Sequence, residues 1–121
     1  MRITGNAFEQ RACAELERAG LKLLARNYTT RYGELDLVMS ERDTVVFVEV
    51  RYRRGSSART NFGDGIDSVS AAKRAKLARA AAMFLASQPR LSQRACRFDV
   101  LAIAGDAATP SLDWCKNAFE A

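Results

Sequence analysis

Two apolar segments and the short turn between them, residues 33–54, constrain the fold of this chain most strongly. The stretch GELDLVMSERDTVVFVEVRYRR is rich in β-branched and aromatic residues, which are typical of strands, and residues 41–43 form a polar turn. The pattern therefore predicts two paired strands. Acidic residues nevertheless interrupt both apolar runs, Glu34 and Asp36 in the first and Glu49 in the second.

The alternation of side chains along a strand predicts where these acids lie. In the second strand Val46, Val48 and Val50 share one face, and in the first strand Leu35, Leu37 and Met39 do so. An even-numbered turn would put both apolar sets on one face and gather the carboxylates on the other. A two-residue turn sets Asp36 opposite Glu49, whereas a four-residue turn sets Glu34 opposite Glu49. An odd-numbered turn would bury acids among the valines, which is costly.

Carboxylates clustered in this way repel one another unless a cation offsets their charge. Hard oxygen ligands suit a divalent ion such as Mg²⁺ or Mn²⁺, and Arg51, which projects on the same face as Glu49, is the other candidate cation. The alternative is a solvent-exposed Glu49–Arg51 ion pair on a polar sheet face. Val38, Val45 and Phe47 make half of that face apolar, which favours a partly buried pocket.

A helix is predicted at residues 6–20, because Phe8, Ala12 and Leu16 recur at helical spacing. Asn6 is the expected N-cap and Gly20 the expected terminator. We expect this helix to cover the acidic face of the hairpin. Glu9 then either reaches the other carboxylates or completes a capping box with Asn6, and the sequence leaves both roles open.

The rest of the chain completes an α/β pattern. Residues 21–28 and 96–105 are predicted strands, 70–87 an alanine-rich helix, and 111–121 an amphipathic tail. Residues 54–68, with several glycines and arginines, are predicted to form a mobile basic loop. The length of 121 residues suits a single domain spanning the whole chain, and the element order implies a mixed sheet with helices packed on it.

Composition excludes several classes of enzyme. The chain has no histidine, so hydrolases with a histidine base and HExxH zinc peptidases are ruled out. Cys13, Cys96 and Cys115 are widely spaced, which predicts buried thiols without a disulfide framework or zinc site. The formal net charge of +5 suits a polyanionic partner such as nucleic acid. Neither a secretory signal nor a membrane-spanning run is present, which predicts a cytoplasmic protein.

The ordered set formed by Glu9 in GNAFEQRA, GELDLV, VFVEVRYR, FGDGIDSVSAAKRAKLARAA and CRFDVLAI resembles the YraN family of bacterial proteins, over nearly the whole chain. That family is similar to archaeal Holliday junction resolvases and to the restriction-endonuclease-like superfamily with its PD-(D/E)XK motif. The resemblance implies a three-layer α/β/α fold with a mixed sheet. It also implies a Mg²⁺- or Mn²⁺-dependent endonuclease with DNA as the expected substrate and branched or recombination and repair intermediates as candidates. The sequence alone does not decide between DNA and RNA, or whether the substrate is branched.

Carried over residue by residue, the resemblance implies metal ligation by Asp36, Glu49 and the Val50 carbonyl. Arg51 stands where the motif has lysine. Arginine stays protonated and cannot act as a base, but it can orient water or stabilise charge on the phosphate. Glu9 and Glu34 are candidates for a second ion or its waters. Basic residues expected to bind the nucleic-acid backbone are Arg53, Arg54, Arg59, Lys73, Arg74 and Lys76.

Three questions stay open on the sequence. An inactive nucleic-acid-binding module, with Arg51 paired to Glu49 or Asp36, and a protein-interaction domain are the alternatives to a nuclease. Asp99, on a later strand, is either a further acid of the site or a structural hydrogen-bonding residue. Resolvases cut symmetric junctions as dimers, which makes a homodimer a candidate assembly, although no segment identifies an interface.

Overall fold

The computed structural model describes residues 3–53, 69–105 and 109–119. In chain order the elements are α1 (Ile3–Arg18), β1 (Lys22–Thr30), β2 (Gly33–Glu41), β3 (Thr44–Arg53), α3 (Ala71–Ala86), β4 (Cys96–Ala104) and β5 (Ser111–Phe119). The basic loop predicted at residues 54–68 lies outside the described residues. Within them, no helix is both long and apolar enough to cross a membrane.

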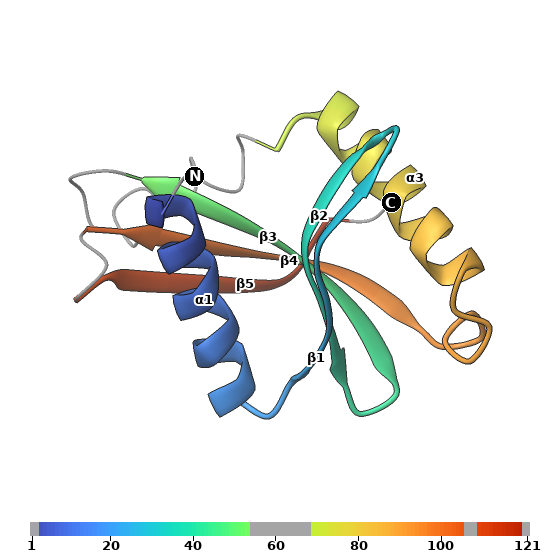
Figure 1. Ribbon diagram of the computed structural model, residues 1–121, viewed down its shortest axis with the longest axis horizontal. Helices are drawn as coiled ribbons and strands as arrows, with labels where there is room; N and C mark the ends of the chain where they lie inside the picture. The colour runs from blue at the N-terminus through green and yellow to red at the C-terminus, as the bar shows by residue number, and fades with distance from the viewer. Residues whose placement is uncertain (1–2, 54–68, 106–108, 120–121) are drawn as a thin grey trace.

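The described strands form one twisted five-stranded sheet whose strands follow the order of the chain, β1-β2-β3-β4-β5 (Figure 1). All neighbouring strands are antiparallel except β3 and β4, which are parallel. A parallel pair needs a crossover connection, and α3 belongs to that crossover. The predicted α/β architecture with a mixed sheet is therefore confirmed.

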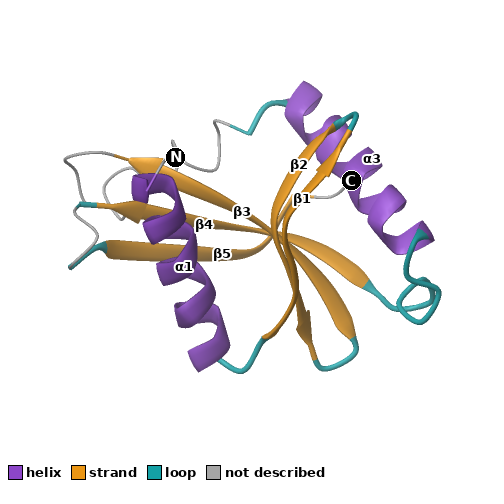
Figure 2. Ribbon diagram, in the orientation of Figure 1, coloured by secondary structure: helices purple, strands orange, loops and turns teal. Residues whose placement is uncertain are grey.

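The two helices of the described residues, α1 and α3, pack on opposite faces of the sheet (Figure 2). On one face, α1 packs Phe8, Ala12 and Leu16 against a group formed by Leu37, Met39, Val46 and Val48. On the other, α3 packs Leu77, Ala80, Ala81 and Phe84 against a group that includes Val38, Val45 and Phe47. The expectation that the first helix covers the face of Phe47 is thus wrong. Both faces of β3 are apolar, so the alternation of its side chains did not indicate which helix covers which face.

The β2–β3 hairpin has the two-residue turn that sets Asp36 level with Glu49. Glu41 pairs with Thr44 across Arg42 and Asp43, and the ladder continues to the pair of Leu37 and Val48. Arg42 takes a left-handed conformation with φ of 55°. The predicted even register is confirmed.

Leu35 departs from the predicted alternation. It is buried in the core beneath α3, with Phe47, and not in the α1 core with Leu37. The backbone pairing of β2 and β3 ends at Leu37, and beyond it the Asp36 side chain accepts the N–H of Val50. Pairing of β2 with β3 therefore stops at Leu37 while pairing with β1 continues to Gly33, and Leu35 changes face in this stretch.

The ends of α1 match the sequence at one terminus only. The helix begins at Ile3, so Asn6 lies inside it and the predicted N-cap is wrong. Gly20 ends the helical segment as expected, with φ of 105°. The Leu21 N–H donates to the Leu16 carbonyl at 3.1 Å, closing a Schellman-type turn that glycine accommodates without strain.

The predicted amphipathic tail is the edge strand β5, which pairs with β4. It carries partners for Asp99, a carboxylate with no exposed surface. Asp99 accepts hydrogen bonds from Arg97 Nε at 3.0 Å, Trp114 Nε1 at 2.9 Å and the Asn117 N–H at 2.8 Å. These contacts fix β5 on β4 and support the structural alternative for Asp99.

The cysteines are free thiols, as predicted, but only Cys13 is buried. Cys96 is exposed and Cys115 is partly exposed, so the expectation of three buried thiols is wrong for those two. Burial raises the pKa of the Cys13 thiol, which disfavours the reactive thiolate.

Candidate functional site

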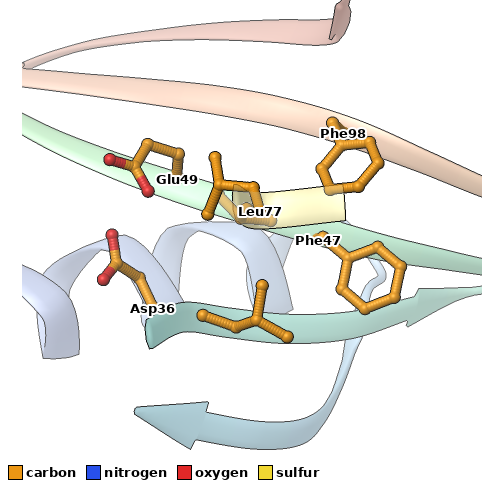
Figure 3. A pocket seen from close by; sticks show the side chains of 7 residues that line it. Asp36, Phe47, Glu49, Leu77 and Phe98 are labelled. Atoms are coloured by element: carbon orange, nitrogen blue, oxygen red, sulfur yellow. The ribbon is translucent and has the colours of Figure 1, made fainter. Parts of the chain in front are cut away.

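Asp36 and Glu49 lie at the end of the β2–β3 hairpin that is remote from its turn. Figure 3 shows their carboxyl groups pointing toward one another from neighbouring strands, with Leu77 of α3 beside them. They line a small cavity of about 10 Å³, room for about one water molecule. Its other walls are formed by the apolar side chains of Leu35, Phe47, Val48, Leu77 and Phe98. The two acids therefore sit at the polar end of an otherwise apolar pocket.

Asp36 is held in place by the backbone of the neighbouring strand. The Val50 N–H donates to Asp36 Oδ2 at 2.9 Å. Burial, and then the negative charge of Glu49, raise the pKa of Asp36 to about 7, while the Val50 hydrogen bond opposes that rise. The charges of Glu9 and Glu34 raise the pKa further. Near neutral pH this carboxyl group is therefore partly protonated, and another cation can compete with the proton for it.

Glu49 is the more buried acid, with 7% of its surface exposed. Its Oε2 atom lies 3.4 Å from Arg51 Nη1 and 3.4 Å from Lys73 Nζ. Arg51 projects from the same strand, whereas Lys73 reaches across from the first turn of α3. The Glu49–Arg51 pair exists, but the burial of its carboxylate distinguishes it from a solvent-exposed surface ion pair.

The remaining predicted acids stand farther out. Glu34 is exposed and Glu9 is partly exposed, although the charges of both act on Asp36. The capping-box role of Glu9 is wrong, because Asn6 is not the N-cap of α1. Within the described ranges, no group of three or more His, Cys, Asp or Glu side chains is arranged to hold a metal ion.

Two carboxylates are nevertheless a sufficient protein contribution for one kind of ion. Mg²⁺ keeps several waters and is commonly bound through one or two carboxylates together with substrate phosphates. The pair of Asp36 and Glu49 fits this requirement. Burial, and then the negative charge of Glu49, raise the pKa of Asp36 to about 7, so a cation bound beside both acids would favour the ionised form of Asp36. Thiol and imidazole ligands are absent from the pocket lining, which favours a hard cation over zinc.

Apart from Lys73, which contacts Glu49, the predicted basic residues divide into three groups. Lys76 is exposed on α3. Arg74 is engaged in packing, because its Nε donates to the Val69 carbonyl at 2.9 Å and its guanidinium lies 5.3 Å from the Phe119 ring centre. The Arg53 side chain, Arg54 and Arg59 lie outside the described part of the structure.

Sequence reasoning missed the place of Lys73. It was grouped with the backbone-binding residues, whereas its ammonium contacts Glu49. The only sequence signal is its position three residues after Ser70, whose side chain caps α3 by accepting the Lys73 N–H at 3.1 Å. That spacing places Lys73 in the first helical turn but gives no information on which strand the turn approaches.

Comparison with known proteins places this site in a family. A family model described as "Uncharacterised protein family UPF0102" matches residues 8–103, a range that contains both carboxylates, Arg51 and Lys73. The chain belongs to this family. A UPF0102 protein of Ectopseudomonas mendocina (strain ymp) is 52% identical over 117 residues, covering 97% of this chain and 94% of the relative. UPF0102 proteins of Stutzerimonas stutzeri (strain A1501) and Pseudomonas aeruginosa (strain LESB58) are 47% and 46% identical, covering 97% and 99% of this chain and 94% of each relative.

Proposed function

We propose that this UPF0102 protein is a metal-dependent endonuclease that hydrolyses phosphodiester bonds in DNA, as its resemblance to the YraN family implies. The observation that carries the proposal is the pairing of Asp36 with Glu49 in one pocket, where their repulsion helps to raise the pKa of Asp36 to about 7. Two neighbouring ionised acids without a cation would destabilise the folded protein at neutral pH. A bound divalent ion would offset their repulsion, so the repulsion favours ion binding.

In this proposal Asp36 and Glu49 hold one Mg²⁺ or Mn²⁺ ion, with the Val50 carbonyl as a further ligand. When bound, the ion neutralises phosphate charge and activates water. Glu9 and Glu34 act on the ion through its waters. Arg51 stays protonated, so it contacts the phosphate or the attacking water and does not remove a proton.

The remaining basic residues bind the DNA backbone. Lys76 on the exposed side of α3 and the arginines of residues 53–59 contribute charge to this contact, and the net charge of +5 supports attraction to a polyanion. Branched recombination and repair intermediates are the substrates that the resolvase resemblance favours. DNA as substrate would place the protein in the cytoplasm, and a symmetric junction would suit a homodimer.

The second candidate is a DNA-binding module of the same fold without catalysis. The observation that favours it is the pair of cations on Glu49, Arg51 and Lys73, each 3.4 Å from the same oxygen atom. These two groups already compensate the Glu49 charge. A module of this kind would bind DNA without a metal ion, with an affinity that falls steeply as salt increases.

The deciding experiment compares cleavage of labelled single-stranded, duplex, flap and four-way-junction DNA in Mg²⁺, Mn²⁺ or EDTA. Wild type is tested beside Asp36→Ala and Glu49→Ala, with Asp43→Ala, an exposed acid of the hairpin turn, as matched control. Metal-dependent cleavage that is lost in the first two variants and kept in the third is expected. Salt-dependent binding by all four proteins without cleavage would contradict the nuclease and support the binding module.

A further inference from the structure

Among the described residues, Lys73 is a cation that reaches Glu49 from another element, the helix α3. Its Nζ lies 3.4 Å from Glu49 Oε2, and its side chain is 44% exposed while that of Glu49 is 7% exposed. The ammonium therefore stands at the boundary between the buried carboxylate and solvent. A substrate phosphate approaching the two acids from solvent would meet this group.

The backbone around Lys73 is fixed. Ser70 caps the helix, the Arg74 N–H donates to the Ser70 carbonyl at 2.9 Å, and Val69 is almost fully buried in the core beneath α3. The Arg74 side chain also donates to the Val69 carbonyl. A first helical turn anchored at this many points holds the Lys73 backbone in a constant position relative to β3.

The charge of this turn is unfavourable for the helix itself. No acid lies in the first turn of α3, whereas Lys73 and Arg74 place positive charge there. The N-terminus of a helix carries partial positive charge, so acidic residues or bound anions stabilise it and basic residues do not. The Glu49 carboxylate supplies one anion beside Lys73, and a substrate phosphate would supply a second at the helix terminus.

We propose that Lys73 is the catalytic lysine of this site and replaces, from α3, the lysine that the nuclease motif places at the position of Arg51. This inference rests on the proposed function. The Lys73 ammonium contacts a non-bridging oxygen of the scissile phosphate, between the acid pair and the first turn of α3. Lysine suits this contact because its compact ammonium is a point charge on a flexible stem.

The reaction at this contact is hydrolysis. Water forms a bond to phosphorus, the bond from phosphorus to one bridging ester oxygen breaks, and negative charge grows on the non-bridging oxygens. The attacking water releases its proton to solvent, and the leaving oxygen takes a proton from solvent. Lys73 remains protonated throughout and stabilises the developing charge by donating a hydrogen bond.

A second property of Lys73 can be measured without cleavage. Lys73 would compete with a divalent ion for Glu49, because both are cations at one carboxylate. Removing the ammonium should therefore strengthen metal binding and, if Lys73 is catalytic, weaken cleavage. Few other roles predict opposite changes in these two quantities.

The test compares wild type, Lys73→Met, Lys73→Arg and Lys73→Met/Arg51→Lys, with Met83→Gln, at an exposed position of the same helix, as the control. Single-turnover cleavage at saturating DNA, Mn²⁺ titration by calorimetry and thermal unfolding are measured for each. In Lys73→Met the cleavage rate should fall about 100-fold or more, the loss typical of one transition-state donor. Mn²⁺ should bind severalfold more tightly, and Lys73→Arg and the double variant should each recover at least tenfold of the lost rate. Met83→Gln should cleave at the wild-type rate.

Several results would overturn the inference. Wild-type cleavage by Lys73→Met, with tighter Mn²⁺ binding, would reduce Lys73 to a counter-ion of Glu49. A fall in rate, Mn²⁺ affinity and melting temperature together, without rescue by Arg51→Lys, would make it a structural residue. If wild type binds Mn²⁺ through Asp36 and Glu49 but cleaves no DNA, the proposed function itself fails and this inference falls with it.

Discussion

The Val50 backbone N–H donates to the carboxylate of Asp36 at 2.9 Å, at the point where the last backbone pair of β2 and β3 has just been made. In a regular β-ladder the Val50 N–H would donate to a backbone carbonyl of β2, but here it donates to the Asp36 side chain. The hydrogen bond fixes the Asp36 carboxyl group beside Glu49, even though the two acids raise the free energy of the folded state when both are ionised. The geometry of the pair is therefore maintained by the sheet and does not depend on a bound ion.

Asp36→Asn should make the protein more stable at pH 8. The folded-state pKa of Asp36 is raised from 3.8 to about 7, so the folded protein binds more protons than the unfolded chain between these values. Its stability therefore falls as pH rises from about 4 to above 7. Asparagine removes this loss and can still accept the Val50 N–H, which gives a gain on the order of 2 to 4 kcal/mol at pH 8.

Urea unfolding of wild type, Asp36→Asn and the exposed control Asp43→Asn at pH 4, 6 and 8 would measure this effect. The difference between wild type and Asp36→Asn should be small at pH 4 and largest at pH 8. A constant difference at all three pH values would show that Asp36 does not titrate in this range.

Divalent ions should stabilise the wild-type protein, and more strongly at higher pH. Metal binding requires ionised Asp36, so the apparent affinity for Mn²⁺ should rise by about tenfold per pH unit below about pH 7 and level off above it. Binding to the folded state alone raises the melting temperature by mass action. Thermal unfolding at pH 6 and pH 8, with and without about 5 mM Mn²⁺, would measure this shift in melting temperature.

The same shift should be absent in Asp36→Asn and Glu49→Gln and present in Asp99→Asn. Asp99 is the appropriate control because it is a buried acid of the same sheet that already has its hydrogen-bond donors. If Mn²⁺ raised the melting temperature of Asp36→Asn as much as that of wild type, the ion would bind at another site.

Asp99→Asn should destabilise the fold without affecting metal binding. The substitution leaves the Arg97 guanidinium without its buried carboxylate partner, which typically costs about 3 to 5 kcal/mol. Trp114, the single tryptophan of the chain, donates to Asp99 and so reports on this region by fluorescence. Glu41→Gln removes the more exposed partner of the same arginine and should cost less than about 1 kcal/mol. Similar losses in the two variants would contradict the structural role assigned to Asp99.

Arg74→Ala and Lys76→Ala should separate folding from DNA binding on α3. Arg74 holds the Val69 carbonyl and packs over Phe119, so its loss should lower stability by about 1 to 2 kcal/mol. Lys76 is exposed, so its loss should leave the stability of the fold unchanged and weaken DNA binding. The slope of the logarithm of the binding constant against the logarithm of the salt concentration should become shallower by about one unit. Urea unfolding and fluorescence anisotropy at several salt concentrations would measure the two effects. A loss of stability in Lys76→Ala, with a loss of DNA binding alone in Arg74→Ala, would contradict the roles assigned to these two residues.

The sequence predicted the architecture and the acid pair because both depend on local rules. The alternation of Val46 and Val48 with Phe47, together with a two-residue turn, determines the register that sets Asp36 level with Glu49. The helical spacing of Phe8, Ala12 and Leu16 similarly predicted a helix whose apolar side is buried.

The errors arose where a residue depends on a distant partner. The sheet face on which α3 packs decides which helix covers Phe47 and which carboxylate Lys73 contacts. The strand at residues 111–119 escaped prediction because its alternation is interrupted at Asn117, whose φ is 54°, and because the Asp99 carboxylate on β4 that accepts the Asn117 backbone N–H is distant in the sequence. Leu35 was misplaced because the pairing of β2 with β3 stops at Leu37, a long-range feature that the periodicity of the sequence does not contain.

Because the strands follow the order of the chain, the acid pair and its lysine should assemble at different stages of folding. Asp36 and Glu49 belong to a hairpin closed by a two-residue turn, whereas Lys73 arrives only with the longer crossover to β4. Short loops close faster than long ones, so the two carboxylates should meet before that cation reaches them. A proton on Asp36 would then relieve the repulsion during this interval. Refolding followed by Trp114 fluorescence should accordingly be faster at pH 6 than at pH 8 in wild type, and equally fast at both in Asp36→Asn.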